Sequence, residues 1–405
     1  MRQVVCVSHA RIIFTTVPQF FTADFVHNGH VYLPKGTAVG IDEQGKIIAI
    51  GNAVQEKVQH LSGLLCPGFV NAHCHLELSD MLGKIPMHTG LVAFLQQVNA
   101  FYKHRNDSDA IAAAQAQDAV MYQRGIAAVG DICNTSFSMR AKNNSRIAYR
   151  NFIEVFGAVP QAAPQRMQAA KALLQQFLDS GFSNTSITPH AVYSISNALW
   201  QVIDAHLQNE TLVSIHNQES AAEDALIKAA SGEFINFLAQ ISTDIPVAMA
   251  HHVSALQYHA QQLSNCQHVL LVHNTFSSEE DIAFAQQRYK SRTWCVCPMA
   301  NHYIEKHINP LYAHLHAINE NVCIGTDSLA SNTQLCMLTE MQMFQQYYPH
   351  ISAEILLKWA TSNGAKALRF KHLGEIAIGT TPGLVHIDTW QESHIPATAT
   401  INRIA

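Results

Sequence analysis

Two histidines separated by one residue, His73 and His75, are the first candidates for chemistry in this sequence. They end the segment PGFVNAHCH, whose apolar run is typical of a buried strand. Side chains at positions i and i+2 of a strand point to the same face, so both imidazoles can reach one ion. Histidine is also the commonest metal ligand. The pair indicates a metal site, although surface or core histidines can produce the same isolated spacing.

Polar residues end similar apolar runs throughout the middle of the chain. The runs are 68–75, 126–131, 151–156, 186–190, 212–216, 269–274, 293–298 and 322–327, and the polar residues are His73, His75, Asp131, Glu154, His190, His216, His273, Cys297 and Asp327. Helical stretches lie between them, for example 112–124 and 162–180, and a capping-box pattern at 277–280 opens another. Eight strand–helix units predict a (β/α)₈ barrel of the TIM type, whose active site lies at the carboxyl ends of the strands. The stretch 241–268 does not fit a simple eightfold count, because 246–252 could be a further strand.

The two ends of the chain predict a second, smaller unit. Short strand-like runs occur at 31–33, 38–41 and 46–50, with a turn at 42–45, and a similar run occurs at 384–387. Neither end is long enough to bury a core alone. We therefore expect a small composite β-sandwich domain built from residues 1–66 and 373–405, beside a barrel of residues 67–372.

The composition narrows the class of protein. Of 405 residues, 48% are apolar and only 14% are charged, which excludes a disordered chain. Lys and Arg total 25 against 30 Asp and Glu, and a net charge of −5 disfavours a nucleic-acid partner. No apolar run is long enough for a membrane span. Nine cysteines without a CxxC pair indicate reduced thiols in a cytoplasmic protein.

The motifs, taken together, resemble the amidohydrolase superfamily, in its branch of deaminases and chlorohydrolases that act on nitrogen heterocycles. The resemblance is carried by PGFVNAHCH, by PHAVYS at 189–194, by His216-x-x-Glu219, by Val272-His273-Asn274, by Cys297-Pro298-x-x-Asn301 and by Gly325-Thr326-Asp327-Ser328. It covers nearly the whole chain. It implies that His73, His75, His216 and Asp327 hold one divalent metal ion, Zn²⁺ in the first place and Fe²⁺ as the alternative. Binuclear members place a lysine or glutamate at the end of the fourth strand, and SITPHAVY offers neither.

The same resemblance implies roles for the remaining polar residues. Water activated by the metal would attack the amine-bearing carbon of an aromatic ring. Glu219 would carry a proton from that water to the ring nitrogen, His273 would orient the water, and Asp327 would assist proton removal. His190 resembles a substrate-binding histidine. Simpler alternatives stay open: Glu219 could merely favour a helix start, His190 could be a buried structural histidine, and His273 could be a further metal ligand.

The substrate is predicted from the same resemblance. The stretches HxHLELS, IEVFG and SIHNQESxxE look most like the aminodeoxyfutalosine deaminases of menaquinone biosynthesis, which act on the adenine moiety of 6-aminodeoxyfutalosine. Glu77 and Glu154 are candidates for contacts to such a small-molecule substrate, and Glu77 could equally pair with an arginine. The alternatives are a chlorohydrolase, a hydrolase of guanine, s-triazine or cyclic amides, and a non-catalytic relative. Family members are often homodimers. We interpret Cys297 and the pair His251-His252 as structural.

Overall fold

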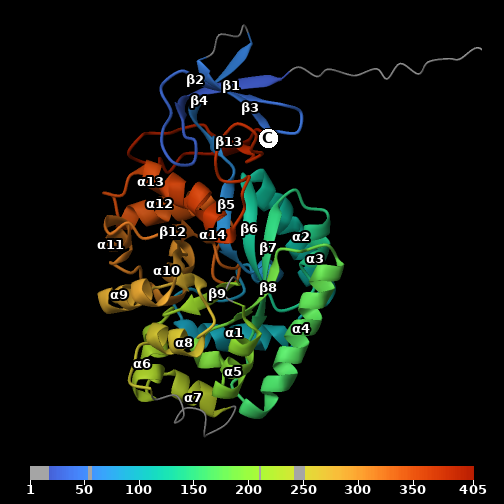
Figure 1. Cartoon of the computed structure of the whole chain (residues 1–405), viewed down its shortest axis with the longest axis vertical. Helices are drawn as coiled ribbons and strands as arrows, with labels where there is room; N and C mark the ends of the chain where they lie inside the picture. The colour runs from blue at the N-terminus through green and yellow to red at the C-terminus, as the bar shows by residue number, and fades with distance from the viewer. Residues whose placement is uncertain (1–17, 53–56, 209–210, 241–250) are drawn as a thin grey trace, which may run out of the picture.

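The computed structural model describes residues 18–52, 57–208, 211–240 and 251–405. Its central feature is a barrel of eight parallel strands with helices on the outside (Figure 1). The barrel strands are β5 (Phe69–Cys74), β6 (Ile126–Cys133), β7 (Ala148–Val155), β8 (Thr185–Pro189), β9 (Leu212–Asn217), β10 (His268–His273), β11 (Ser291–Val296) and β12 (Val322–Ile324). Each strand coincides with one of the eight strand-like runs of the sequence, so the predicted (β/α)₈ fold is confirmed.

Two half-barrels close against each other at two seams. The strand orders are β5-β6-β7-β8 and β9-β10-β11-β12, and all pairings within each half are parallel. At the seam between β8 and β9, the His216 amide donates to the His190 carbonyl at 3.0 Å. At the other seam, the amides of Thr326 and Asp327 both donate to the His73 carbonyl at 3.0 Å. Barrel closure itself therefore brings the candidate site residues together.

Helices follow the barrel strands along the chain and surround the barrel (Figure 1). They are α1 (Leu91–Tyr102), α2 (Asp107–Gln123), α3 (Met139–Asn143), α4 (Ala163–Asp179), α5 (Asn197–His206), α6 (Ala221–Ala229), α7 (Phe234–Ala239), α8 (Ala255–Gln262), α9 (Glu279–Arg288), α10 (Pro298–Glu305), α11 (Tyr312–Ala317), α12 (Met337–Tyr347), α13 (Ala353–Lys358) and α14 (Gly364–Leu368). The helices predicted at 112–124 and 162–180 are α2 and α4. The predicted capping box forms one residue later than expected, between Ser278 and Asp281, because Ser278 is the residue with extended backbone before α9.

The remaining sheet combines both ends of the chain. Its strands are β1 (Gln19–Val26), β2 (Thr37–Ile41), β3 (Ile47–Asn52), β4 (Val58–Pro67), β13 (Leu384–Ile387) and β14 (Ile401–Arg403), in the order β14-β13-β4-β1-β2-β3. A composite β-domain was predicted, and its described strands form one sheet rather than two stacked layers. The run at 31–33 is not a strand, since Tyr32 forms only an isolated bridge with His27. The boundaries at residues 67 and 372 stay predictions.

The connection from β9 to β10 is the part of the barrel for which the sequence did not predict the number of strands. Residues 241–250 lie outside the described part of the chain, so most of the possible strand at 246–252 does too. The described chain continues through His251 and His252, which form no strand, into α8. Among the described residues, no helix combines the length and the apolar character that crossing a membrane requires.

A buried ion pair supports the strand that carries the two leading histidines. Asp131, at the end of β6, accepts the Leu76 amide at 2.8 Å through Oδ1 and lies 2.5 Å from Lys142 Nζ through Oδ2. Lys142 also contacts Asn151 Oδ1 at 2.7 Å and Cys133 Sγ at 3.2 Å. Burial opposes the lysine charge, but Asp131 outweighs it and raises the pKa of Lys142 above its ordinary value. Lys142 therefore stays charged, and its pair with Asp131 fixes the chain directly after His75.

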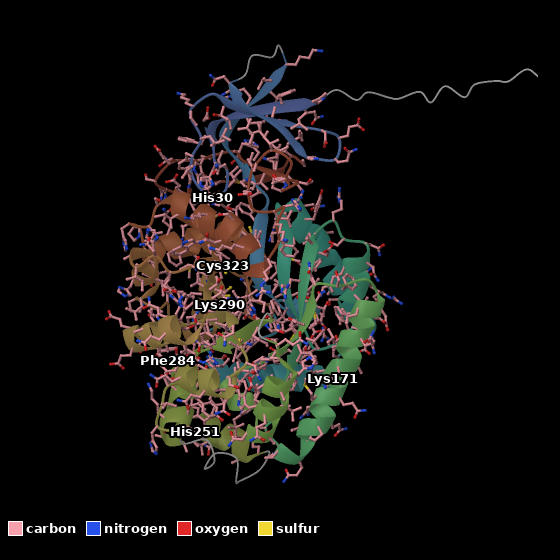
Figure 2. The ribbon with its side chains drawn as sticks, viewed as in Figure 1. His30, Lys171, His251, Phe284, Lys290 and Cys323 are labelled. Carbon is pink, nitrogen blue, oxygen red and sulfur yellow. The ribbon has the colours of Figure 1, made fainter. Side chains whose placement is uncertain are left out.

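Replacing Lys142 by methionine is expected to lower the free energy of unfolding by about 3–5 kcal/mol, because the Asp131 carboxylate would stay buried without a counter-charge. Chemical denaturation measures this loss. The control is Lys171→Met, since Lys171 is exposed on α4 (Figure 2) and should change stability by less than about 0.5 kcal/mol. Equal losses in both variants would contradict a structural role for the ion pair.

Candidate metal and catalytic site

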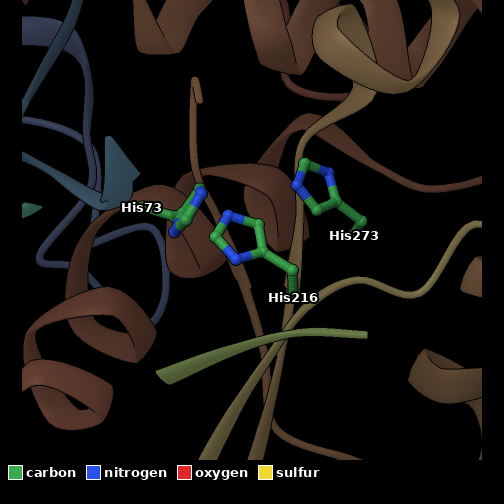
Figure 3. Close-up of side chains that lie close together, drawn as sticks. All are labelled: His73, His216 and His273. Atoms are coloured by element: carbon green, nitrogen blue, oxygen red, sulfur yellow. The ribbon is translucent and has the colours of Figure 1, made fainter. Parts of the chain in front are cut away.

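Three imidazoles and one carboxylate converge at the carboxyl end of the barrel. His75 Nε2 lies 3.2 Å from His73 Nε2 and 3.2 Å from His216 Nε2. Asp327 Oδ1 lies 3.5 Å from His73 Nε2 and 3.4 Å from His75 Nε2. Nitrogen atoms of His73, His216 and His273 also lie within 4.8 Å of one another, and Figure 3 shows these three rings together. The structure thus brings the predicted ligand set into one cluster.

The spacing of these four atoms matches the shell of a metal ion. Bonds of about 2.0–2.1 Å in a tetrahedral zinc site place neighbouring ligand atoms about 3.3–3.4 Å apart. The four contacts within the cluster lie between 3.2 and 3.5 Å. Three imidazoles and one carboxylate are also a donor set that divalent metals such as zinc accept. The residues present therefore fit a divalent metal ion.

Hydrogen bonds fix which nitrogen of two of the imidazoles faces the cluster. His216 Nδ1 donates to the His190 carbonyl at 3.1 Å, which leaves Nε2 with its lone pair toward His75. His273 Nδ1 lies 2.9 Å from Asn301 Oδ1. The Tyr312 hydroxyl donates to the His273 carbonyl and so accepts from Asn301 Nδ2 at 2.7 Å, which makes Asn301 Oδ1 the acceptor. Each of the two histidines consequently presents an unprotonated Nε2 to the site.

Burial keeps the imidazoles neutral, and the histidines around Asp327 keep its carboxylate charged. Desolvation lowers the pKa of His73, His216 and His273, and it lowers that of His75 to about 4. Burial alone would raise the pKa of Asp327, but its hydrogen bond to His73 and the neighbouring histidines hold it well below its usual range. Metal binding requires neutral imidazoles and an ionised carboxylate, so both groups are in the protonation state that a metal needs.

Four of the ten described non-glycine residues with positive φ lie around this cluster. Gln218, His273, Asn274 and Asp327 have φ values of 46°, 71°, 58° and 58°, in the left-handed region that non-glycine residues rarely adopt. Such positions persist where the surrounding structure determines them, as barrel closure does for Asp327 through the His73 carbonyl. Strain at neighbouring strand ends is typical of a functional site rather than of a structural core.

Glu219 points into this site and does not belong to the following helix. Helix α6 begins two residues later, with Ser220 as the N-cap, and its first-turn acids include Glu223. Glu223 accepts the Glu219 amide at 3.0 Å, which fixes the turn. Glu219 Oε1 lies 3.7 Å from His273 Nε2, and burial followed by repulsion from Asp327 raises the pKa of Glu219 well above its ordinary value. The alternative of an acid that only favours a helix start is therefore wrong.

A cavity of about 350 Å³ opens from the cluster toward solvent. All the predicted polar site residues except the fully buried His73 line it, namely His75, Glu77, Glu154, His190, His216, Glu219, His273 and Asp327. The rest of its wall is mostly apolar and comes from α1, from the segment after β7 and from α7. A mostly apolar pocket with a few convergent polar groups is the usual form of a small-molecule site.

His190 and Glu154 present polar atoms to this cavity. His190 Nδ1 lies 2.8 Å from Ser194 Oγ, which donates onward to the Ala191 carbonyl, so His190 Nε2 is an acceptor. Glu154 Oε2 accepts from Asn134 Nδ2 at 3.0 Å, whereas buried Oε1 has no hydrogen-bond partner among the described residues. Burial raises the pKa of Glu154 to about 8, so its carboxyl group can donate at neutral pH.

Glu77 mainly holds the loop that follows β6. Its carboxylate accepts the amides of Asn134 and Thr135, at 3.0 to 3.2 Å, and the Thr135 hydroxyl at 2.8 Å. Arg105 pairs with Asp80 at 2.8 Å and contacts only the backbone carbonyl of Glu77. The predicted arginine partner of the Glu77 carboxylate is therefore wrong, while a contact from Glu77 to substrate stays a prediction.

Cys297 and His251, two of the three residues interpreted as structural, pack against other residues, whereas His252 is exposed. The Cys297 thiol is buried in the barrel, and burial raises its pKa to about 11, which makes it a poor nucleophile. His251 stacks on Tyr258 with ring centroids 4.2 Å apart and lies beside α6 and α8 (Figure 2). The eight described cysteines are all unpaired and buried.

Ser331 was missed from the sequence, and Asp131 and Asn301 were named without a role, although all three position the site. Ser331 donates to Asp327 Oδ2, and Asp131 anchors the Leu76 amide beside His75. Asn301 stood in a quoted motif, and the structure shows that it orients His273. Asp131 was singled out only as the polar end of a strand-like run.

Comparisons with known proteins agree with this geometry. An adenosine deaminase from Helicobacter pylori is 26% identical over 359 residues, which cover 83% of this chain and 84% of that protein. An aminodeoxyfutalosine deaminase from Nitratiruptor sp. is 27% identical over 341 residues, covering 81% and 79%. The solved structure of Helicobacter pylori aminofutalosine deaminase with methylthio-coformycin has a TM-score of 0.80 at 21% identity and covers 96% of this chain and all of that one.

The family comparison covers most of the chain. Residues 64–404 match the model of the amidohydrolase family, which includes every barrel strand and the C-terminal strands β13 and β14. The matched range contains all the residues of the His and Asp cluster and Glu219. The chain therefore belongs to the amidohydrolase family.

Proposed function

We propose that the protein is a metal-dependent hydrolytic deaminase that removes the exocyclic amine from the adenine ring of a nucleoside. The observation that carries the proposal is the position of Glu219, which lines the same cavity as His75, His216 and Asp327. Together with the buried His73, these three residues are spaced for a metal ion. The names of the relatives, adenosine deaminase and aminodeoxyfutalosine deaminase, support the same reaction and an adenine nucleoside substrate.

We propose one metal ion, Zn²⁺, held by His73, His75, His216 and Asp327. The end of β8 carries no lysine or glutamate that could bridge to a second ion, since the chain there reads TPHAVY. A divalent metal at such a site lowers the pKa of water and so makes a nucleophile available near neutral pH.

Glu219 and His273 handle the protons of the reaction. Glu219 takes one proton from the attacking water and gives it to the ring nitrogen next to the amine-bearing carbon. Asp327 assists transfer of the second proton of the water to the amine, which leaves as ammonia. A raised pKa suits a group that must both accept and return a proton. The unprotonated Nε2 of His273 accepts a hydrogen bond from the water and orients it, while Asn301 holds the ring in that tautomer.

His190 and Glu154 bind the rest of the substrate. His190 Nε2 is an acceptor, and Glu154 offers a free carboxyl oxygen 3.4 Å from the His216 ring. Hydroxyl and amine groups of a nucleoside supply complementary donors and acceptors. Glu77 supports substrate binding indirectly. Its carboxylate accepts the Asn134 amide, and the Asn134 side chain donates to Glu154.

The alternative reactions within the family would require different groups in the site. A chloride ion leaves without a proton, whereas an amine must be protonated to leave, so the buried Glu219 beside His273 favours a deaminase over a chlorohydrolase. A non-catalytic relative would have no need of a complete ligand set in an open cavity. A homodimer and a cytoplasmic location stay predictions.

A screen of nucleobases tests the proposal. The zinc-loaded protein is expected to release ammonia from adenine nucleosides at least about 100-fold faster, by kcat/KM, than from guanine, cytosine or an amino-s-triazine, because wrongly placed polar groups in a buried pocket lose hydrogen bonds. An ammonia-coupled assay at equal substrate concentration measures the ratios. Faster release from guanine or triazine would replace the proposed substrate by that alternative.

A further inference from the structure

Glu340 is a fully buried glutamate that takes no part in the reaction described above. It lies in the first turn of α12, away from the cavity wall. Both of its carboxylate oxygens accept hydrogen bonds, Oε1 from Asn332 Nδ2 at 2.8 Å and Oε2 from the Met299 amide at 2.9 Å. Burial raises the pKa of Glu340 to about 8, so an ionised carboxylate is costly here. One side chain thus connects the loop after β12 with the start of α10.

The contact with Asn332 leads to Asp327. The Nδ2 atom of Asn332 also donates to the Thr326 carbonyl at 2.9 Å, directly before Asp327. The φ value of Asp327 is 58°, a conformation that persists only where neighbouring groups hold it. Glu340 therefore helps to hold, through Asn332, the turn that directs the Asp327 carboxylate toward the histidines.

The contact with Met299 leads to His273. Helix α10 begins with Pro298, which has no amide hydrogen, and its N-cap side chain accepts no amide of the helix. Glu340 instead accepts the Met299 amide, and a carboxylate at this end of a helix is favoured by the helix dipole. Two residues further along α10, Asn301 accepts from His273 Nδ1 at 2.9 Å. Because α12 packs against α10 (Figure 1), Glu340 also fixes the support of the His273 ring.

We propose that Glu340 is a positioning residue that sets the position of Asp327 relative to His273. The inference rests on the proposed function, which assigns one of these groups to the metal and the other to the attacking water. A carboxylate suits this position because each of its oxygens accepts from one N–H donor. A glutamine has a single acceptor oxygen, so its NH₂ group would face one of the two donors and break that contact.

Glu340→Gln tests the proposal in the cobalt-loaded and zinc-loaded protein. The visible absorption of Co²⁺ depends on the arrangement of its ligands, so a displaced Asp327 should change the spectrum. Zinc affinity, measured by competition with a chelator, should fall about 10- to 100-fold. In proton NMR of the zinc protein, the signal of the His273 Nδ1 hydrogen should shift. For an adenine nucleoside, kcat per bound zinc ion should fall about 10- to 100-fold, with KM within about twofold.

Glu320→Gln is the matched control. The Glu320 carboxylate is also largely buried, and it accepts from Arg292 and, at 2.9 Å, from the Trp294 indole. It precedes β12 and therefore lies at the end of the barrel opposite to the site. This variant should keep the wild-type cobalt spectrum, zinc affinity, His273 signal and kcat per bound zinc ion.

Asn332→Ser separates the two contacts and serves as the test if Glu340→Gln does not fold. The serine hydroxyl is too short to join Glu340 to the Thr326 carbonyl, while the Met299 contact remains. The cobalt spectrum and zinc affinity should change, and the His273 signal should stay at its wild-type position.

The outcomes that overturn the proposal are distinct. A wild-type spectrum and zinc affinity in either Glu340→Gln or Asn332→Ser would overturn the link to Asp327. A wild-type His273 signal in Glu340→Gln would overturn the link to His273, and equal effects in Glu320→Gln would overturn both. None of these three readouts requires turnover. If they change as expected but no adenine nucleoside releases ammonia, the proposed reaction alone is overturned.

Discussion

Replacing Glu219 by glutamine is expected to lower kcat for adenine nucleosides by about 10³-fold while the metal content stays at the wild-type level. The amide keeps the size of the side chain but cannot accept a proton from water, and general acid–base catalysis contributes about 10²- to 10⁴-fold. The carboxylate lies 3.7 Å from His273 and outside the cluster of closely spaced ligand atoms, so the ligand set survives. Steady-state ammonia release and elemental analysis of the same sample measure both quantities.

Glu154→Gln is the matched comparison for this variant. It makes the same exchange of atoms in the same cavity, but we propose that Glu154 binds substrate, so KM should rise more than kcat falls. Glu219→Gln should instead lower kcat and kcat/KM together. A Glu219→Gln enzyme with wild-type turnover would remove the proton-transfer role, and a variant that has lost its metal would make Glu219 a ligand.

Replacing His75 by alanine should weaken zinc binding by at least about 100-fold, and turnover should fall in proportion to the zinc that is lost. His75 has the largest number of close contacts in the cluster, since its Nε2 lies 3.2 to 3.4 Å from His73, His216 and Asp327. Losing a residue that only hydrogen-bonds a metal ligand weakens metal binding by about 10- to 100-fold. Loss of a direct ligand should therefore exceed that range. Competition with a chromophoric chelator measures the affinity.

His104→Ala is the control for the zinc measurement, because His104 is exposed after α1 and does not line the cavity. It should bind one zinc ion per chain with wild-type affinity. Full zinc occupancy of the His75→Ala protein under the same competition would contradict the assignment of His75. Two tightly bound ions in the wild-type protein would contradict the proposal of a single metal.

The barrel could be predicted from the sequence because its strands are buried on both faces. Such strands are continuous apolar runs that end at one polar residue, as in VLLVHN and VCIGTD, and all eight such runs are strands. The strands β1 and β4 of the terminal sheet were missed because their apolar residues are interrupted by polar ones, as in QFFTADFV and VQHLSGLLCP. Their pairing joins residues far apart in the chain, which local patterns do not encode.

The sequence alone could predict only those site residues that stand at the ends of the strand-like runs. The HxH spacing and the strand-end positions identify the five histidines His73, His75, His190, His216 and His273. The hydrogen bonds that orient His216 and His273 could not be predicted, because they join segments that meet only on folding, whereas the contact of His190 with Ser194 is local.

Two contacts illustrate this limit. His273 is oriented by Asn301, 28 residues away, and Asn301 in turn contacts Tyr312 in α11. The Arg166 guanidinium carbon lies 5.6 Å from the centre of the Phe156 ring, a contact between α4 and the end of β7 that the sequence does not indicate.

The measurement that tests the account most directly is deamination of adenosine by the zinc-loaded protein in water enriched in ¹⁸O. The account predicts ammonia and an inosine product in equal amounts, with one ¹⁸O atom at the carbon that carried the amine, and loss of both products after chelation of the metal. Product that lacks ¹⁸O, or undiminished turnover without metal, would contradict a metal-dependent hydrolytic deaminase.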